Sequence, residues 1–167
     1  MSTAIMERYK DSSLDNFRCS DKYQENMIKY FRDCVKNGFS DNIVLTGKVG
    51  TGKTHLCYAI INALEEKNQT YKWYSSNKVY YTTVTEMIGF IRALWGKNSD
   101  KYDHDAVNRL KNIPLLIIDE IGVQYGTESE RIELFDIFNH RYNSCLPTMV
   151  VSNLDRDKIE HTLGAVS

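Results

Sequence analysis

The spacing of hydrophobic positions predicts that helices alternate with short buried strands along this chain. Apolar side chains recur every three or four positions from Ser20 to Asn37, which is the spacing of a helix with one buried face. Ser20 is a residue type that caps helix starts, and Asn37 followed by Gly38 is a typical helix end. The apolar run over 43–46 predicts a buried strand, and the spacing over 53–66 predicts a second helix. In the first helix we expect these side chains to face inward: Tyr23, Met27, Tyr30, Phe31, Cys34 and Val35.

The same alternation continues after a polar and aromatic stretch over 67–78, which we interpret as a loop or an irregular hairpin. Residues 79–84 are β-branched and aromatic and predict a strand. Thr85 is expected to cap a helix that carries Trp95 on its apolar face, and a shorter helix is predicted over 104–111.

The strongest strand signal lies over 115–118, where four apolar residues leave no position for a wet face. Thr127 and Glu130 form a capping-box pattern that opens a helix, and residues 148–151 predict another buried strand. Asp155 is expected to cap a last helix ending near Leu163. We expect the helix after Thr127 to turn Ile132, Phe135, Phe138 and Tyr142 inward. Strands that alternate with helices predict a three-layer α/β fold with a mainly parallel sheet.

Composition and charge exclude several classes of protein. The 167 residues are 42% hydrophobic and 26% charged, which is typical of one globular domain. A net charge of −1 excludes a uniformly basic protein that coats nucleic acid. No apolar run approaches the roughly 20 residues that span a bilayer, and the N-terminus lacks a secretory signal pattern. The four cysteines lack C-x-x-C spacing, so we expect free, at least partly buried thiols and a cytoplasmic location.

A glycine-rich loop carries the clearest chemical signal. Residues 47–54 fit the phosphate-loop pattern G-x-x-x-x-G-K-[ST] at every fixed position, with a predicted strand before and a helix after. Successive main-chain N–H groups and the helix N-terminus can face one anion, Lys53 can reach the outer phosphates, and the Thr54 hydroxyl can bind Mg²⁺. We expect nucleotide contacts from Lys48, Val49, Gly50, Thr51, Gly52, Lys53, Thr54 and His55.

Polar residues follow two of the predicted strands. Asp119 and Glu120 end the apolar run over 115–118, and Asn153 follows the strand over 148–151. In an open parallel sheet, ligands bind at the carboxyl ends of the strands. Asp119 would then bind Mg²⁺, Glu120 would act as general base toward water, and Asn153 would orient that water, with Lys53 as the third catalytic residue. A water-activating glutamate favours hydrolysis over transfer to a substrate hydroxyl, so a small-molecule kinase is disfavoured.

Together the segments 47–54, 115–124 and 147–154 resemble the DnaC/DnaI-type replicative helicase loaders, which are AAA+ ATPases related to phage replication proteins and IstB-like transposase helpers. The resemblance implies a P-loop NTPase core that binds ATP or ADP with Mg²⁺. It identifies residues 47–54 as Walker A, Asp119 and Glu120 as Walker B, and Asn153 as sensor 1. It also implies a replicative helicase or another replication protein as partner, and self-association through the core. We expect a salt bridge, not a catalytic role, for Arg141.

In this family a segment corresponding to residues 85–112 contacts single-stranded DNA. Here Trp95 and Tyr102 could stack on bases, although Trp95 fits the helix core better, and the cations could equally form a solvated face. The cations of this segment are Arg92, Lys97, Lys101, Arg109 and Lys111. The aromatic residues over 71–74 could also stack on bases, but we favour a role in covering one sheet edge.

The chain departs from the family at both ends. We expect an N-terminal segment over 1–18, an AAA+ core over 19–167, and neither a helicase-binding N-terminal domain nor a C-terminal lid. No arginine finger or sensor 2 can be assigned. The main hypothesis is therefore an ATPase that loads or remodels a helicase on DNA, with weak turnover of this chain alone. The alternatives are a nucleotide-dependent binding module without efficient turnover and a transposase-helper ATPase.

Overall fold

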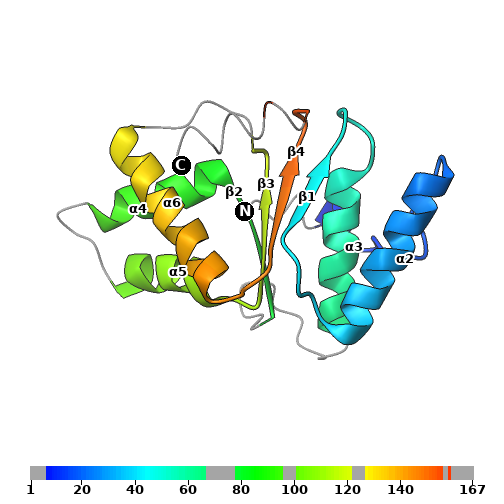
Figure 1. Cartoon of the computed structure of the whole chain (residues 1–167), viewed down its shortest axis with the longest axis horizontal. Coiled ribbons are helices and arrows are strands. Elements are labelled where there is room, and N and C mark those ends of the chain that lie inside the picture. The colour runs from blue at the N-terminus through cyan, green and yellow to red at the C-terminus, as the bar shows by residue number, and fades with distance from the viewer. Residues whose placement is uncertain (1–6, 67–77, 96–100, 122–126, 156–157, 159–167) are drawn as a thin grey trace.

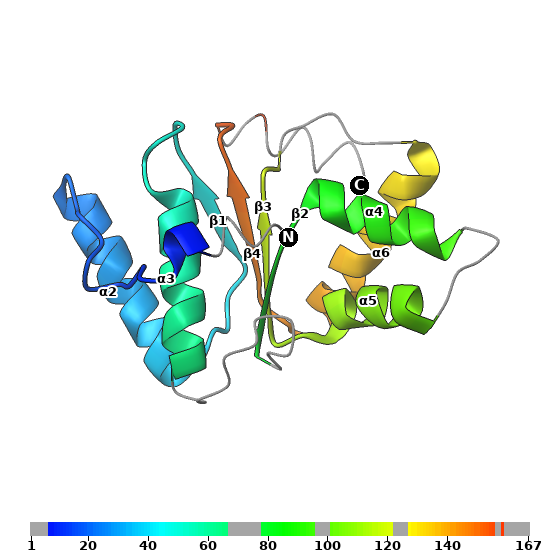
Figure 2. The same ribbon diagram turned by 180° about the vertical axis from the view of Figure 1, so that it is seen from behind.

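A central parallel sheet lies between two layers of helices (Figure 1). The structure is a computed structural model that describes residues 7–66, 78–95, 101–121, 127–155 and 158. The strands are β1 (Ile43–Thr46), β2 (Val79–Thr83), β3 (Leu115–Asp119) and β4 (Thr148–Ser152), in the spatial order β1-β4-β3-β2. Helices α2 (Lys22–Asn37) and α3 (Lys53–Glu66) lie on one side of the sheet. Helices α4 (Val84–Leu94), α5 (Lys101–Asn112) and α6 (Glu128–Asn143) lie on the other, as the reverse view in Figure 2 also shows. The predicted three-layer α/β fold is confirmed.

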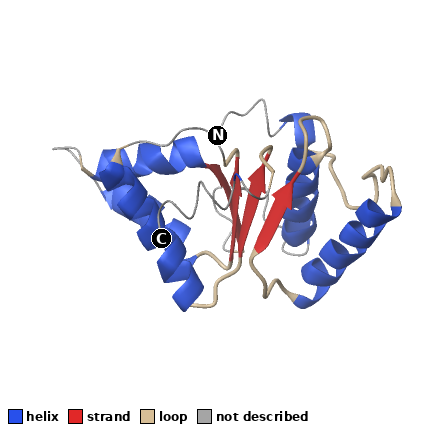
Figure 3. Ribbon diagram, turned by 45° about the horizontal axis from the view of Figure 1, so that its top comes forward, coloured by secondary structure: helices blue, strands red, loops and turns tan. Residues whose placement is uncertain are grey.

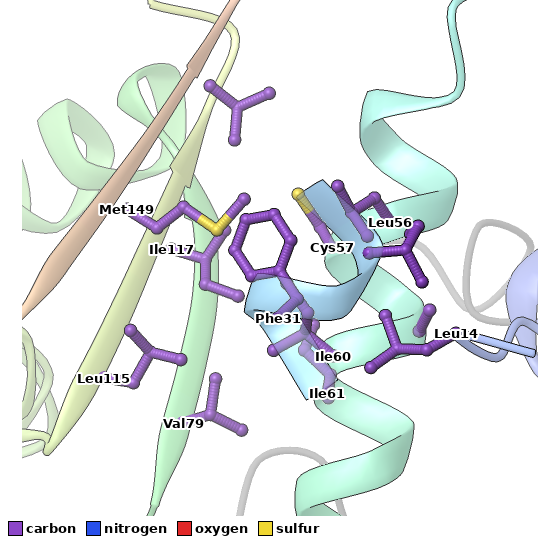
Figure 4. Packing of buried hydrophobic residues seen from close by; sticks show 13 residues of the cluster. Leu14, Phe31, Leu56, Cys57, Ile60, Ile61, Val79, Leu115, Ile117 and Met149 are labelled. Atoms are coloured by element: carbon purple, nitrogen blue, oxygen red, sulfur yellow. The ribbon is translucent and has the colours of Figure 1, made fainter. Parts of the chain in front are cut away.

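Alternate residues of the central strands build two hydrophobic cores, one on each face of the sheet. Leu115 and Ile117 of β3 pack with α2 and α3 in one cluster, part of which is shown in Figure 4. Leu116 and Ile118 pack with α4, α5 and α6 in the other cluster. All five residues of β3 are buried, and so are all five of β4. The absence of a polar face over 115–118 therefore has the expected cause, since helices cover both sides of the strand.

The parallel register brings the ends of the strands to one edge of the sheet, toward which the arrows of Figure 3 point. Thr46 at the end of β1 lies opposite Ser152 at the end of β4. On the other side of β4, Ile118 lies opposite Val150. The residues that follow these strands, Gly47, Asn153 and Glu120, are consequently neighbours at that edge.

Two predicted helix caps lie at other residues. Asp21, not Ser20, caps α2, because its Oδ1 accepts a hydrogen bond from Gln24 N at 2.8 Å. Thr83, not Thr85, caps α4, with a complete capping box to Glu86. In both cases a second cap-forming residue lies close by in the sequence, and the strand or loop before the helix decides which one is used. The capping box of Thr127 and the end of α2 at Gly38 are confirmed.

The predicted buried face of α6 is wrong. Ile132 and Tyr142 are 61% and 72% exposed, Phe135 is also exposed, and only Phe138 is partly buried. The helix buries Glu130, Leu134, Ile137 and Arg141 instead. Arg141 donates to main-chain carbonyls and to the Thr148 hydroxyl, so the expected salt bridge is also wrong for the part of the chain that the structure describes.

Smaller differences concern α2, α4 and the cysteines. In α2, Ile28, Phe31 and Cys34 are buried, whereas Tyr23 and Tyr30 are exposed. Trp95 at the end of α4 is 48% exposed and is not a core residue. The four thiols are free; Cys34 and Cys57 are buried as expected, but Cys19 and Cys145 are exposed.

Two predictions fall largely outside the described residues: the loop or hairpin over 67–78 and the last helix. At the start of the latter, Asp155 Oδ1 accepts a hydrogen bond from Lys158 N at 3.2 Å, as its predicted capping role requires. Across the described segments, no helix is both long and apolar enough to cross a membrane.

Candidate nucleotide-binding site

The glycine-rich loop turns between β1 and α3 through residues with left-handed backbone conformations. Gly50 has φ +83° and Gly52 has φ +89°, a region in which a side chain is strained. A Cβ atom on Gly52 would also lie 3.0 Å from Cε2 of Phe17. Glycine at position 52 therefore permits both the turn and the close approach of the N-terminal segment.

Lys53 closes the loop onto itself. Its Nζ donates to Gly47 O at 2.7 Å and to Lys48 O at 2.9 Å, which uses two of the three N–H groups of the ammonium. Burial lowers the pKa of Lys53 from its ordinary value, and the carboxylate of Asp119 opposes that shift. The ammonium is thus held beside the concave side of the loop.

The first turn of α3 offers main-chain donors to an anion. Leu56 N donates to Gly52 O at 2.9 Å and makes the first hydrogen bond of the helix. The N–H groups of Lys53, Thr54 and His55 therefore precede any carbonyl partner within the helix. Together with the helix dipole, these groups could bind an anion at the end of the phosphate loop.

Asp119 joins the phosphate loop to the end of β3. The residue is buried, and its Oδ2 accepts hydrogen bonds from Thr54 Oγ1 at 3.3 Å and from Tyr81 OH at 2.7 Å. Its Oδ1 accepts a hydrogen bond from Glu120 N at 2.7 Å. Burial and the Asp119 carboxylate raise the pKa of Tyr81 far above its usual range, so the phenol stays protonated and donates.

The two predicted catalytic side chains outside the phosphate loop, Glu120 and Asn153, each directly follow a strand. Glu120 is exposed and has φ +62°, a conformation that is uncommon for a residue with a side chain. Asn153 is also exposed and follows Ser152, whose hydroxyl bonds to Ile121 O and accepts from Leu154 N at 3.0 Å. Both side chains lie at the edge of the sheet where the phosphate loop begins.

The N-terminal segment is attached to α3 beside the loop. Asn62 Nδ2 donates to the carbonyls of Tyr9, Lys10 and Ser12, at 3.3, 3.2 and 2.7 Å. Nε2 of the His55 ring lies 3.0 Å from Asn16 Oδ1. The His55 side chain thus contacts the N-terminal segment, so its predicted contact with an anion would have to come from its main-chain N–H.

A cavity of about 480 Å³ lies between this segment and the phosphate loop. Its lining includes Thr51 and Gly52, which were predicted as nucleotide contacts. Sequence reasoning missed Asn16, Phe17 and Arg18, because a loop without periodicity gives no signal of where it packs, and it also missed Gln24 of α2. Phe17 packs edge-on against His55, with ring centroids 5.7 Å apart.

The oxygen donors at Asp119 fit Mg²⁺. Thr54 Oγ1 donates its one proton to the carboxylate, which leaves lone pairs on the same oxygen for a cation. A hydroxyl and a carboxylate are the hard oxygen ligands that this ion prefers.

The cations predicted to contact DNA have partners within the chain wherever their side chains are described. Arg92 Nε lies 2.5 Å from Glu130 Oε1, and Lys111 Nζ lies 2.5 Å from Asp136 Oδ2. Arg109 lies over the ring of Tyr80, 4.7 Å from its centroid. The side chains of Lys97, Lys101 and Tyr102 lie outside the described residues. The described cations therefore make contacts between elements of the chain, and DNA contact stays a prediction.

Comparison with known proteins relates this geometry to one family. Residues 2–166 match the family described as IstB-like ATP binding protein. The chain is 30% identical over 165 residues to the replicative helicase loader DnaC of Escherichia coli, covering 97% of this chain and 63% of that protein. It is 33% identical over 147 residues to the replicative helicase loader DnaI of Bacillus subtilis, covering 85% of this chain and 44% of that protein. The crystal structure of a DnaC helicase loader has the same fold, with a TM-score of 0.76, 23% identity, and coverage of 96% of this chain and 92% of that one. The chain thus spans less than two thirds of the length of these curated relatives.

Proposed function

The chain belongs to the IstB-like ATP-binding protein family, and from that premise we propose that it binds ATP with Mg²⁺ and hydrolyses it. The contact of Thr54 with Asp119 at 3.3 Å carries the proposal, because it joins the anion site of the loop to the carboxylate of β3. A phosphate loop alone would support binding. A phosphate loop that lies beside carboxylates at the end of a strand supports a metal-dependent reaction of the bound phosphates.

Each group of the site has a role that its position allows. The loop amides, Lys53 and the first turn of α3 bind the phosphates, and Thr54 and Asp119 would hold Mg²⁺. The ion, when bound, neutralises phosphate charge. Glu120 is exposed beside this site and can accept a proton from an attacking water. Asn153, on the neighbouring strand end, can orient that water without adding charge.

The nucleoside would lie next to the loop. The cavity of about 480 Å³ opens beside Gly52 and is lined by the aromatic ring of Phe17 and by polar side chains such as Gln24. A flat apolar surface with a few polar groups is typical of sites that bind a purine base. We therefore place the adenine between the N-terminal segment and α3.

Nucleotide binding is tested with Lys53→Ala, using fluorescence of a labelled ATP analogue. We expect affinity to fall by at least about tenfold, since a charge-assisted contact to phosphate is lost. Lys36→Ala, at the exposed end of α2, is the matched control and should bind like the wild type. Unchanged affinity in Lys53→Ala would contradict the site assignment.

Hydrolysis is tested separately with Glu120→Gln, which keeps the shape of the side chain and removes the base. We expect phosphate release to fall about 10²-fold or more, with nucleotide affinity within about twofold of the wild type. Wild-type protein that binds ATP and releases no phosphate, with or without single-stranded DNA, would instead favour a nucleotide-dependent binding module.

We further propose that ATP binding controls contact with a replicative helicase, as the resemblance to helicase loaders suggests. In size-exclusion chromatography the chain should co-migrate with a replicative helicase in ATP, and Lys53→Ala should not. Co-migration with a transposase in place of the helicase would favour the transposase-helper alternative. Single-stranded DNA is the other predicted ligand, measured by fluorescence anisotropy of a labelled oligonucleotide.

A further inference from the structure

Tyr81 of β2 lies against the carboxylate that the proposed site uses for Mg²⁺. We propose that Tyr81 is a positioning residue that orients Asp119 toward the metal ion. This inference rests on the proposed function, since it concerns the same site. It assigns a role to a residue outside the phosphate loop and the two strand ends.

The register of the sheet explains how Tyr81 reaches Asp119. Strand β2 runs parallel to β3, with Tyr81 opposite Ile117 and Thr83 opposite Asp119. Side chains alternate between the faces of a strand, so Tyr81 and Tyr80 lie on opposite faces. Tyr81 packs against the cluster under α3, and Tyr80 packs against the cluster under α4, α5 and α6. The phenol of Tyr81 therefore points along the α3 face toward the end of β3.

Three groups donate hydrogen bonds to the Asp119 carboxylate. Two of them are side-chain hydroxyls, and the Tyr81 hydroxyl is the nearer of these. Tyr81 OH lies 2.7 Å from Oδ2, whereas Thr54 Oγ1 lies 3.3 Å from the same oxygen. Glu120 N lies 2.7 Å from Oδ1 and holds the other side of the group. A phenol and a main-chain amide on opposite oxygens fix the plane of the carboxylate. Thr54 can then share its oxygen with a cation while the carboxylate stays in place.

The ring of Tyr81 is held independently of its hydroxyl. It packs against the ring of Tyr58 on α3, with centroids 5.2 Å apart. Tyr58 in turn stacks on Tyr9 of the N-terminal segment, with centroids 5.0 Å apart. The variant Tyr81→Phe thus removes one hydrogen bond and keeps the packing, which makes it a sharp test.

The test measures how much Mg²⁺ is needed for binding of a fluorescent ATP analogue. In Tyr81→Phe we expect the Mg²⁺ concentration for half-maximal binding enhancement to rise by roughly tenfold, the usual order for loss of a hydrogen bond to a metal ligand. Binding in EDTA should be unchanged, because the loop and Lys53 are untouched. Electron paramagnetic resonance with Mn²⁺ and ADP should show a matching loss of bound Mn²⁺, and this readout does not depend on turnover.

Tyr80→Phe is the matched control, because it removes the same hydroxyl from the neighbouring residue on the other face of β2. Its Mg²⁺ requirement should equal that of the wild type. An unchanged Mg²⁺ requirement in Tyr81→Phe would overturn the inference. Equal loss of affinity with Mg²⁺ and in EDTA would also overturn it, since that result indicates a structural role.

The two proposals fail in different ways. If the wild type binds no nucleotide under any condition, the proposed function fails. If the wild type binds nucleotide with a clear Mg²⁺ dependence, and Tyr81→Phe reproduces that dependence, the proposed function stands and only the role of Tyr81 is lost.

Discussion

Arg141 shows how a buried charge can be accommodated without a carboxylate. The residue has no exposed surface, and its guanidinium donates to the carbonyls of Leu110, Ile113 and Pro147 at 2.9, 2.8 and 2.7 Å. Its Nε donates to Thr148 Oγ1 at 2.8 Å. Burial lowers the pKa of Arg141 to about 10, so the group is still charged at neutral pH. One side chain therefore connects the end of α5 with the starts of β3 and β4.

We predict that Arg141→Lys destabilises the protein although it keeps the charge. A lysine ammonium has three donors on one atom and cannot reach acceptors spread around a planar guanidinium. Carbonyls left without partners should cost about 3 kcal/mol in the free energy of unfolding. Urea denaturation measures this loss, with the exposed Arg131→Lys on the same helix as control. A loss below about 1 kcal/mol would show that water replaces the guanidinium.

At the scale of single residues, the sequence predicts those roles that depend on neighbouring residues in the chain. The glycines of the phosphate loop, Lys53 and Thr54 form one continuous motif, and the motif itself requires their backbone conformations. Tyr81 reaches Asp119, and Arg141 reaches the carbonyls of Leu110 and Ile113, in segments far away in the sequence, so the packing of those segments decides their roles. A single sequence carries no pattern that marks an arginine as fully buried. It also carries none that marks a tyrosine whose hydroxyl reaches the next strand.

Helix α6 is held at its start by a glutamate with two functions. Glu130 completes the capping box with Thr127, whose N donates to Glu130 Oε2 at 2.7 Å. Its other oxygen lies 2.5 Å from Arg92 Nε on α4. The Arg92 hydrogen bond, followed by the amide of Thr127, lowers the pKa of Glu130 from its ordinary value.

This lowered pKa predicts a pH dependence of stability. The folded state favours the charged form of Glu130, so its contribution is complete above the unfolded pKa of 4.5 and is lost as pH falls through the folded value. Thermal melts from about pH 6 to about pH 3 should show a smaller fall in Tm for Glu130→Gln than for the wild type. Glu128→Gln, at an exposed position of the same turn, should keep the wild-type slope. Equal slopes in all three proteins would contradict this account.

The face of α6 illustrates why element positions are predicted better than element orientations. The helix carries two apolar stripes, one through Ile132 and Phe135 and one through Leu134 and Ile137. The periodicity of apolar residues reveals both stripes but does not show which of them is buried. The structure buries the second stripe, because it continues into Arg141 and its carbonyl partners. The helices and strands themselves were predicted within a few residues, since the apolar runs of the strands and the glycine and threonine boundaries are local.

At the scale of the whole molecule, the order of the strands assembles the site. Strand β4 pairs with β1 on one side and with β3 on the other. The phosphate loop and the acidic pair, far apart in the sequence, thus lie on either side of Asn153. The hydrophobic runs predicted a parallel sheet, but the order of its strands and the position of the N-terminal segment beside the loop came only from the structure.

We predict that Asn62→Asp loosens the N-terminal segment from the rest of the molecule. The substitution replaces a donor amide with a carboxylate oxygen that would face the carbonyls of Tyr9, Lys10 and Ser12. Amide hydrogen exchange over 9–17 should become about tenfold faster, consistent with the loss of one to two hydrogen bonds. Asn108→Asp, exposed on α5, serves as control and should leave this exchange unchanged. Unaltered exchange in Asn62→Asp would mean that the other contacts of the segment, such as those of Leu14 and Asp15, hold it without Asn62.

The attachment of the N-terminal segment also has a mechanical consequence. The segment hydrogen-bonds to α3 through Asn62 and to α2 through Arg32, whose Nη2 lies 2.8 Å from Asp15 Oδ1. Tension applied to the first residues is therefore transmitted to the helices before it reaches the strands. The phosphate loop is the covalent joint between α3 and β1, so it lies on the path of that tension. A nucleotide bound at the loop would add contacts at this joint between the helix and the strand.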